Sequence, residues 1–288
     1  MAVSEQLKKL VDQMPDPDGR GMLTENIDKE KIEKAIAEIH KGGRANVLGL
    51  IDMLGAPGSA GNVKPHYALH CLANHTLVVK DQNGRKQFCE ALVGELGADR
   101  SDHIKAFLCQ ELGWAGREEA VPALGKLLPD EDLSSPAAMA LVAIGGEGAA
   151  AQFRAAWPNA KGKARHSIID GLAAVADPPS SVIFKGALGD KDPEIRMAAA
   201  AGLANLGDAS ASAALTSACA SAEGWEAFQF AKSCLVLAEK LDAAGKKADA
   251  RNVYENLIVV KPLKHIQHAA ERGLAKLAGQ KIPEKAPQ

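Results

Sequence analysis

Apolar residues recur at spacings of three and four along most of the chain, a pattern that is typical of amphipathic helices. The segment 192–208, DPEIRMAAAAGLANLGD, has the clearest form of it. Asp192 is a good N-cap, the proline after it fits the first helical position, and Gly207 is typical of a C-terminal stop. The stripe between these ends consists of Ile195, Ala199, Gly202, Leu203 and Leu206. Because so short a helix is marginal alone, we expect it to pack against neighbouring helices.

The same stripe recurs with a period of about 30 residues, slightly longer near the end, which indicates an internal repeat. Upstream, for example, Arg165 takes the place of Arg196, and Gly171 that of Gly202. Helices that carry the stripe are expected in 63–75, 104–116, 133–146, 164–177, 192–208, 227–239 and 266–279. A first helix of each pair is expected before them, in 44–55, 84–96, 117–128, 149–157, 180–188, 210–220 and 246–260.

Short alternating helices of this kind bury their stripes only between neighbours. The sequence therefore predicts an all-α fold, an α-solenoid of about seven stacked antiparallel helix pairs that curve into a superhelix. We expect the solenoid to span residues 28–279 and to begin with a charged amphipathic helix that caps it. Residues 1–27 are expected to form a short helix and a linker, and residues 280–288 a flexible tail.

The segment 192–208 resembles the HEAT repeat in its bacterial, phycobilin-lyase-like form: Asp and Pro, a β-branched residue, Arg, paired alanines, Leu and a closing Gly. The resemblance covers residues 28–279 and is most specific over 101–208. The run 84–131 also resembles the HEAT region of planctomycete multi-module proteins. These resemblances imply that the second helix of each pair lines a concave surface, and they bring no catalytic motif to the chain.

Composition narrows the class of protein further. Aromatic residues make up only 4% of the chain beside 27 glycines, which favours close packing of slender helices. The net charge of −2, with both signs interspersed, argues against a general basic surface for nucleic acids or acidic membranes. The five cysteines form no CxxC pair and fall in apolar stretches, so we expect reduced, buried thiols and a cytoplasmic location.

Signals for export and for membrane insertion are missing from the sequence as given. The N-terminal segment has no apolar core of the signal-peptide kind, and no apolar stretch is long enough to span a membrane. We therefore expect no membrane span. An exported protein is the alternative if a leader has been removed.

Motifs that would carry chemistry are sparse. His66 and His70, four positions apart on an expected helix, are the candidates for a shared metal ion. No Glu stands between them as in HExxH, so we expect neither a metal nor a cofactor. The chain has no GxxxxGK[ST] loop and no GxSxG motif, and helix capping accounts for its carboxylates at helix starts. The sequence thus predicts no catalytic residues.

The large and titratable side chains gather on the second helices, where we expect them to contact a partner. Tyr and Trp are common anchors of protein interfaces, although in an alanine-rich array they also serve to fill gaps. The recurring arginines form a ladder that pairs with cap carboxylates such as Asp192 or binds an acidic ligand. The candidates are Tyr67, His70, His103, Phe107, Trp114, Arg165, His166, Arg196, Trp225, Gln229 and His268.

Three functions remain compatible with these features. The leading hypothesis is a non-catalytic scaffold or binding module whose concave face grips a protein or peptide. The first alternative is a lyase or chaperone that holds a bilin-like cofactor or a client in the groove. The second alternative is nucleic-acid binding through convergent Lys and Arg residues, which the acidic balance opposes.

Overall fold

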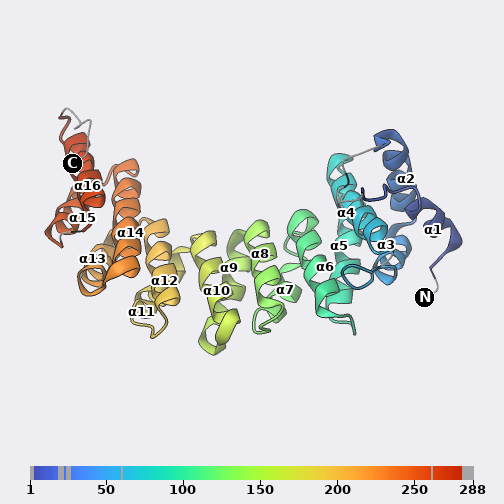
Figure 1. Cartoon of the computed structure of the whole chain (residues 1–288), viewed down its shortest axis with the longest axis horizontal. Coiled ribbons are helices and arrows are strands. Elements are labelled where there is room, and N and C mark those ends of the chain that lie inside the picture. The colour runs from blue at the N-terminus through green and yellow to red at the C-terminus, as the bar shows by residue number, and fades with distance from the viewer. Residues whose placement is uncertain (1–2, 19–22, 24–26, 60, 261, 281–288) are drawn as a thin grey trace. The chain divides into compact units, whose positions relative to one another are not determined.

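The computed structural model describes residues 3–18, 23, 27–59, 61–260 and 262–280 (Figure 1). These residues form sixteen α-helices and three short 3₁₀-helices, and none of them lies in a strand. The chain divides into two compact units, Met1–Gln152 and Phe153–Gln288. Every helix pair expected from the sequence is present, so the prediction of an all-α helical-repeat fold is confirmed.

The first unit contains three of the expected pairs, preceded by two further helices. The second helices α4, α6 and α8 pack in a row, and each also packs on the first helix of its own pair. Helix α2, the expected leading helix, packs on α4. The helices are α1 (Glu5–Val11), α2 (Lys29–Lys41), α3 (Gly43–Asp52), α4 (Val63–Val78), α5 (Gln82–Leu96), α6 (Asp102–Ala115), α7 (Val121–Leu127) and α8 (Ser134–Ile144).

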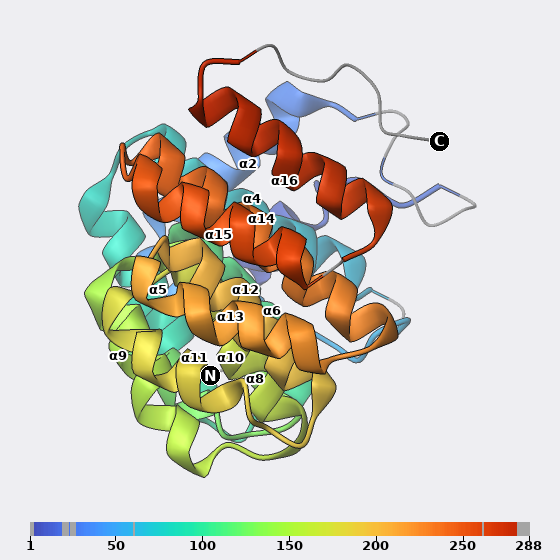
Figure 2. The ribbon, with the colours of Figure 1, turned by 90° about the vertical axis from the view of Figure 1, so that its left-hand side faces the viewer.

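The second unit continues the repeat. Helices α10, α12, α14 and α16 pack in sequence, and Figure 2 shows α14, α15 and α16 lying side by side. Helix α9 (Gly146–Ala156) enters this unit with its last residues. The others are α10 (Gly162–Val175), α11 (Ser181–Ala187), α12 (Pro193–Leu206), α13 (Ser212–Ser221), α14 (Gly224–Ala243), α15 (Lys247–Val259) and α16 (Lys264–Leu277). Short 3₁₀ turns occupy Trp157–Asn159, Pro178–Ser180 and Ala209–Ala211.

In three pairs of the second unit, an aromatic ring of the first helix packs closely against a glycine of the second. A Cβ atom added at any of these glycines would approach the ring to within 2.3–2.5 Å. The glycine is thus required because it leaves the space that the ring fills. The pairs are Phe153 with Gly171, Phe184 with Gly202, and Tyr254 with Gly273.

The helix ends follow the chemistry of the sequence. The Asp192 side chain accepts a hydrogen bond from the Glu194 N–H at the start of α12, with Pro193 at the first helical position. Gly207 ends the helix with φ of 64°, in the left-handed region that favours glycine. The expected start and stop of this helix are therefore confirmed.

The remaining expectations concern thiols, membranes and the chain ends. All five cysteines are free; Cys71 is half-buried and the other four are buried. Within the described part of the chain, no helix combines the length and the apolar character that a membrane crossing requires. The expected short N-terminal helix is present as α1, whereas residues 281–288 of the expected tail lie outside the described residues, as do 19–22 and 24–26 of the linker.

Candidate functional site

An apolar groove lies between α6 and α8 in the first unit. It has a volume of about 630 Å³. Trp114 and Met139 stand at its walls and are 54% and 71% exposed, respectively. The main lining side chains are Phe107, Gln110 and Trp114 of α6, and Pro136, Met139 and Ala143 of α8.

The groove follows from the helical spacing and from small residues at the contact. Phe107, Gln110 and Trp114 stand three and four positions apart, so that one stripe of α6 carries them all. Beneath them, α6 and α8 approach closely, because a Cβ added at Gly113 would lie 3.3 Å from the Ala140 Cα atom. Small residues at the contact and large residues at the rim together produce a hollow.

A polar network lies behind Trp114, between α4 and α6. The His70 Nδ1 atom is 3.1 Å from both carboxylate oxygens of Glu111. The Asn74 amide nitrogen lies 3.1 Å from His70 Nε2, and it also donates to the His70 carbonyl oxygen. Glu111 is fully buried, and burial raises the pKa of its carboxyl group, although the neighbouring His70 acts in the opposite direction. The His70 ring meets the Trp114 indole edge-on, with 6.0 Å between ring centroids.

Two further histidines lie near the other end of the same helices. The His66 ring packs on Phe107 with centroids 4.4 Å apart, and its Nδ1 atom donates to the Asn62 carbonyl oxygen at 2.8 Å. Burial lowers the pKa of His66. His103 Nε2 lies 3.2 Å from the Gly55 carbonyl oxygen.

Five candidates from the sequence thus fall on α4 and α6. Three of them line the groove, and His70 lies behind Trp114. Tyr67 is half-buried on α4, where burial and the neighbouring Cys71 raise its pKa. The groove residues among the candidates are His103, Phe107 and Trp114.

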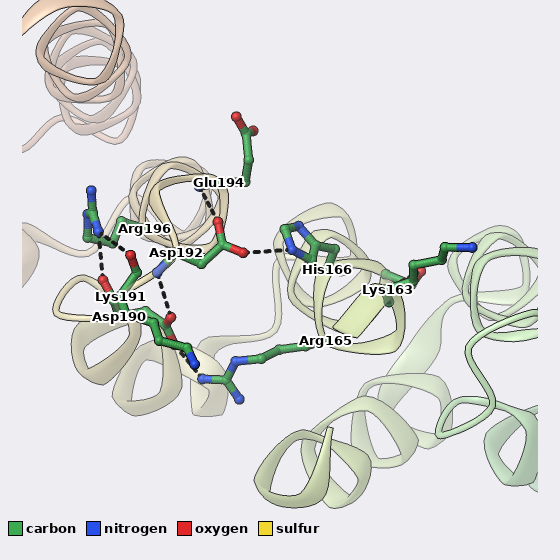
Figure 3. A network of polar contacts seen from close by, with 9 residues as sticks. Lys163, Arg165, His166, Asp190, Lys191, Asp192, Glu194 and Arg196 are labelled. Atoms are coloured by element: carbon green, nitrogen blue, oxygen red, sulfur yellow. Dashed lines mark hydrogen bonds and ion pairs between the residues drawn. The ribbon is translucent and has the colours of Figure 1, made fainter. Parts of the chain in front are cut away.

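Arg165, His166 and Arg196 of the second unit each contact a carboxylate. Arg165 Nη2 lies 2.6 Å from Asp190 Oδ2, and its guanidinium stacks 3.9 Å from the centre of the Trp157 ring. His166 Nε2 lies 2.9 Å from Asp192 Oδ2. Figure 3 shows both side chains directed from α10 toward the turn that precedes α12.

The arginine ladder exists, but its partners differ from the expected ones. Arg196 forms a bidentate pair with Glu226. It also donates to the Asp190 carbonyl oxygen at 2.8 Å (Figure 3). The expected pairing of the arginines with Asp192 is therefore wrong. One oxygen of Asp192 caps α12 by accepting from the Glu194 N–H and the other meets His166, whereas Arg165 pairs with Asp190 and Arg196 with Glu226.

The last three candidates are on α14 and α16. Trp225 is 65% exposed and stacks on Phe228 with centroids 5.2 Å apart; Phe228 in turn lies 5.7 Å from the His265 ring. Gln229 is half-buried. The prediction that His268 contacts a partner is wrong, because this side chain is only 8% exposed and packs within the unit.

The metal candidates His66 and His70 do not converge with further ligands. Among the described residues, no group of three His, Cys, Asp or Glu side chains is arranged to hold a metal ion. Both nitrogens of His70 have protein partners, Glu111 and Asn74.

Sequence reasoning missed Glu111 and Met139. The signal for Glu111 was available, because it directly precedes the repeat leucine, Leu112, at the position that holds only small residues in other second helices. These small residues are Ala140, Gly171, Gly202, Cys234 and Gly273. The sequence has no comparable signal for Met139, because its place in the groove depends on the face of α8 that stays exposed to solvent in the fold.

Comparison with known proteins supports the repeat. The family model for HEAT repeats matches residues 158–231, which confirms the HEAT-like resemblance over that part of the chain. No curated protein matches the chain.

Several solved structures are similar in fold. An engineered protein is 19% identical, with a TM-score of 0.41 over 96% of this chain and 79% of its own. The complex of CpcE and CpcF of the phycocyanin lyase from Nostoc sp. is 17% identical, with a TM-score of 0.37 over 88% and 94%. Human deoxyhypusine hydroxylase in complex with glycerol is 14% identical, with a TM-score of 0.31 over 83% and 96%. With scores this low, none of these likenesses bears on function.

Proposed function

Because the chain is an all-α helical-repeat protein, we propose that it is a non-catalytic interaction module whose α6–α8 groove binds an apolar segment of a partner protein. The observation that carries the proposal is the pair of large exposed side chains, Trp114 and Met139, at the walls of an apolar hollow. Burying one such side chain contributes roughly 1.5–3 kcal/mol, and Trp is enriched among interface hot spots. A partner that covered both side chains would therefore gain substantial binding free energy.

The chemistry of the lining defines what the groove accepts. Among the residues that the structure describes, the lining includes no Asp, Glu, Lys or Arg. Its titratable member, His103, is already directed at the Gly55 carbonyl oxygen. An inserted segment would therefore be uncharged and apolar, with Gln110 as a hydrogen-bonding partner at the rim.

The proposal assigns no reaction to this groove. General acid–base catalysis needs titratable groups within hydrogen-bonding reach of the reacting atoms, and an uncharged apolar lining favours binding instead. A volume of about 630 Å³ also lies within the usual range for small-molecule sites, so a small apolar ligand is the competing occupant.

The test compares partner capture by three forms of the protein. The groove variant is Trp114→Ala with Met139→Ala, and the matched control is Val182→Ala with Val259→Ala, which removes exposed apolar side chains from the second unit. We expect one protein partner to be retained by wild type and control and lost by the groove variant. A photo-crosslinking residue at Gln110 should label that partner, whereas one at the exposed Lys126 of α7 should not.

Two results would refute the proposal. One is a partner that the groove variant retains as well as the wild type does. The other is native mass spectrometry that finds a co-purified small molecule on the wild type and control and none on the groove variant, since the groove would then hold a small ligand.

A further inference from the structure

Glu111 breaks the repeat at a fully buried position. In the register set by the repeat leucine, Glu111 of α6 is equivalent to Gly171 and Gly202, which receive aromatic rings from their first helices. Glu111 has no exposed surface, and burial raises the pKa of its carboxyl group because the charged form is poorly solvated there. Packing alone would favour a small or apolar residue at this position.

The network around Glu111 fixes one imidazole ring. Because His70 Nδ1 lies 3.1 Å from both Glu111 oxygens, the Nδ1–H group donates to the carboxylate. His70 Nε2 is then the acceptor for the Asn74 amide at 3.1 Å. A ring held at both nitrogens has one orientation and one tautomer.

The fixed ring supports a groove residue. The His70 and Trp114 rings meet at an interplanar angle of 74°, an edge-on arrangement that aromatic pairs favour. Trp114 is 54% exposed and forms part of the groove lining. The His70 ring thus contacts Glu111 at one nitrogen and the Trp114 indole at its edge, which links the buried carboxyl group to the groove wall.

We propose that Glu111 is a positioning residue that acts through His70 to hold the Trp114 indole in the groove wall, and that it serves this purpose without stabilising the fold. The functional part of this inference rests on the proposed groove function. Immobilising a side chain before binding removes an entropic cost that binding would otherwise incur.

The test uses a chain in which Trp114 is the single tryptophan, with Trp157→Phe and Trp225→Phe. Glu111→Met keeps the length of the side chain but removes both acceptors. Glu111→Gln keeps one oxygen that accepts from His70 Nδ1–H. Glu90→Met, at an exposed position of α5, is the control for the same substitution.

Time-resolved fluorescence anisotropy of Trp114 is the deciding measurement. We expect Glu111→Met to enlarge the fast component of indole motion at least twofold, Glu111→Gln to restore it close to wild type, and Glu90→Met to leave it unchanged. The urea midpoint of Glu111→Met should equal or exceed that of the wild type, because the substitution removes the cost of burying a carboxylate and the His70 ring that loses its partner is 38% exposed, so that its N–H can hydrogen-bond to water.

Either of two results would overturn the inference: unchanged Trp114 motion in Glu111→Met, or a urea midpoint well below that of the wild type, which would assign Glu111 a structural role.

A separate titration with 1-anilinonaphthalene-8-sulfonate tests the groove. We expect Glu111→Met to weaken probe binding about three- to tenfold. If Trp114→Ala leaves probe binding intact, the groove proposal fails, while the anisotropy result still decides the role of Glu111.

Discussion

Replacing Gly202 with alanine tests the packing of an aromatic ring on a glycine, which joins the two helices within a pair of the second unit. In an exposed helix this change would stabilise the chain by about 1 kcal/mol, because alanine has the higher helix propensity. In α12, however, the new Cβ would lie 2.5–2.8 Å from three ring atoms of Phe184. Phe184 is fully buried, so its ring has no free space into which to move.

The expected magnitude follows from these two opposing effects. Overpacking a core by one methyl group costs roughly 1–3 kcal/mol, and three ring atoms closer than 3.0 Å place Gly202→Ala in the upper part of that range, at about 2–3 kcal/mol. Subtracting the propensity gain of about 1 kcal/mol leaves an expected net loss of about 1–2 kcal/mol in the free energy of unfolding. With a urea slope of about 2 kcal/mol per M, the midpoint falls by about 0.5–1 M. Gly186 is the matched control, because it lies in α11 with no atom within 4 Å of an added Cβ. Gly186→Ala should raise the midpoint by up to about 0.5 M.

Urea unfolding followed by tryptophan fluorescence measures both changes. With Trp114 replaced by Phe, the signal comes from Trp157 and Trp225 of the second unit. Adding Phe184→Leu to Gly202→Ala should recover part of the loss, as expected of two side chains in direct contact. If Gly202→Ala were as stable as the wild type, or if it behaved like Gly186→Ala, the ring-on-glycine argument would be refuted.

Three further predictions concern other contacts. Arg154→Ala should lower the free energy of unfolding by about 1–3 kcal/mol, because it removes the guanidinium whose Nη1 lies 2.5 Å from Oδ2 of the buried Asp177. Urea unfolding measures the change, and a loss below the error of that measurement would contradict the prediction. The Asp192 backbone N–H and Arg165 hold the pKa of Asp190 below its usual 3.8. The folded state therefore gains stability from these contacts above pH 3.8 and loses it as the pH falls through the lowered pKa. Asp190→Asn should accordingly flatten the acid side of a plot of the free energy of unfolding against pH. Alkylation of the native protein at pH 8 should modify the half-buried Cys71 well before Cys89, Cys109 and Cys234, because burial raises the pKa of these three thiols to about 12. Mass spectrometry measures the rate at each cysteine, and equal rates would contradict the prediction.

Most of the fold could be predicted from the sequence, because local signals specify it. N-cap residues, prolines and closing glycines mark the helix ends, and the apolar stripe marks the buried face. The segment 192–208 contains all of these signals, and α12 forms where they indicate. The division into two units could not be predicted, since it depends on which neighbouring helices pack most closely.

The site was less predictable, because it depends on contacts between repeats. Whether Arg165 meets Asp190 or Asp192 depends on the capping geometry of α12, in which Asp192 uses one oxygen for the helix start. Trp114 and His268 both stand on second helices, yet one is half-exposed and the other buried. Exposure of a stripe residue is set by the neighbouring helix, about which the spacing on its own helix carries no information.

The departures of α6 from the repeat fall together in space, which favours a function at this helix. In the register of the repeat leucine, Trp114 stands where α8, α10 and α12 have Ala143, Ala174 and Asn205, and Phe107 stands where these three helices have Pro136, Ser167 and Ala198. Glu111, the buried charge, lies between these two positions on the same helix, and its partner His70 contacts Trp114. Natural sequences depart from local rules mainly where function requires it, and α6, unlike α8, α10 and α12, combines two large rings and a buried carboxyl group on one helix. Replacing Phe107, Glu111 and Trp114 with the residues that other second helices have at these positions should therefore leave the array folded and abolish the groove. Such a variant separates the contribution of α6 to stability from its contribution to binding.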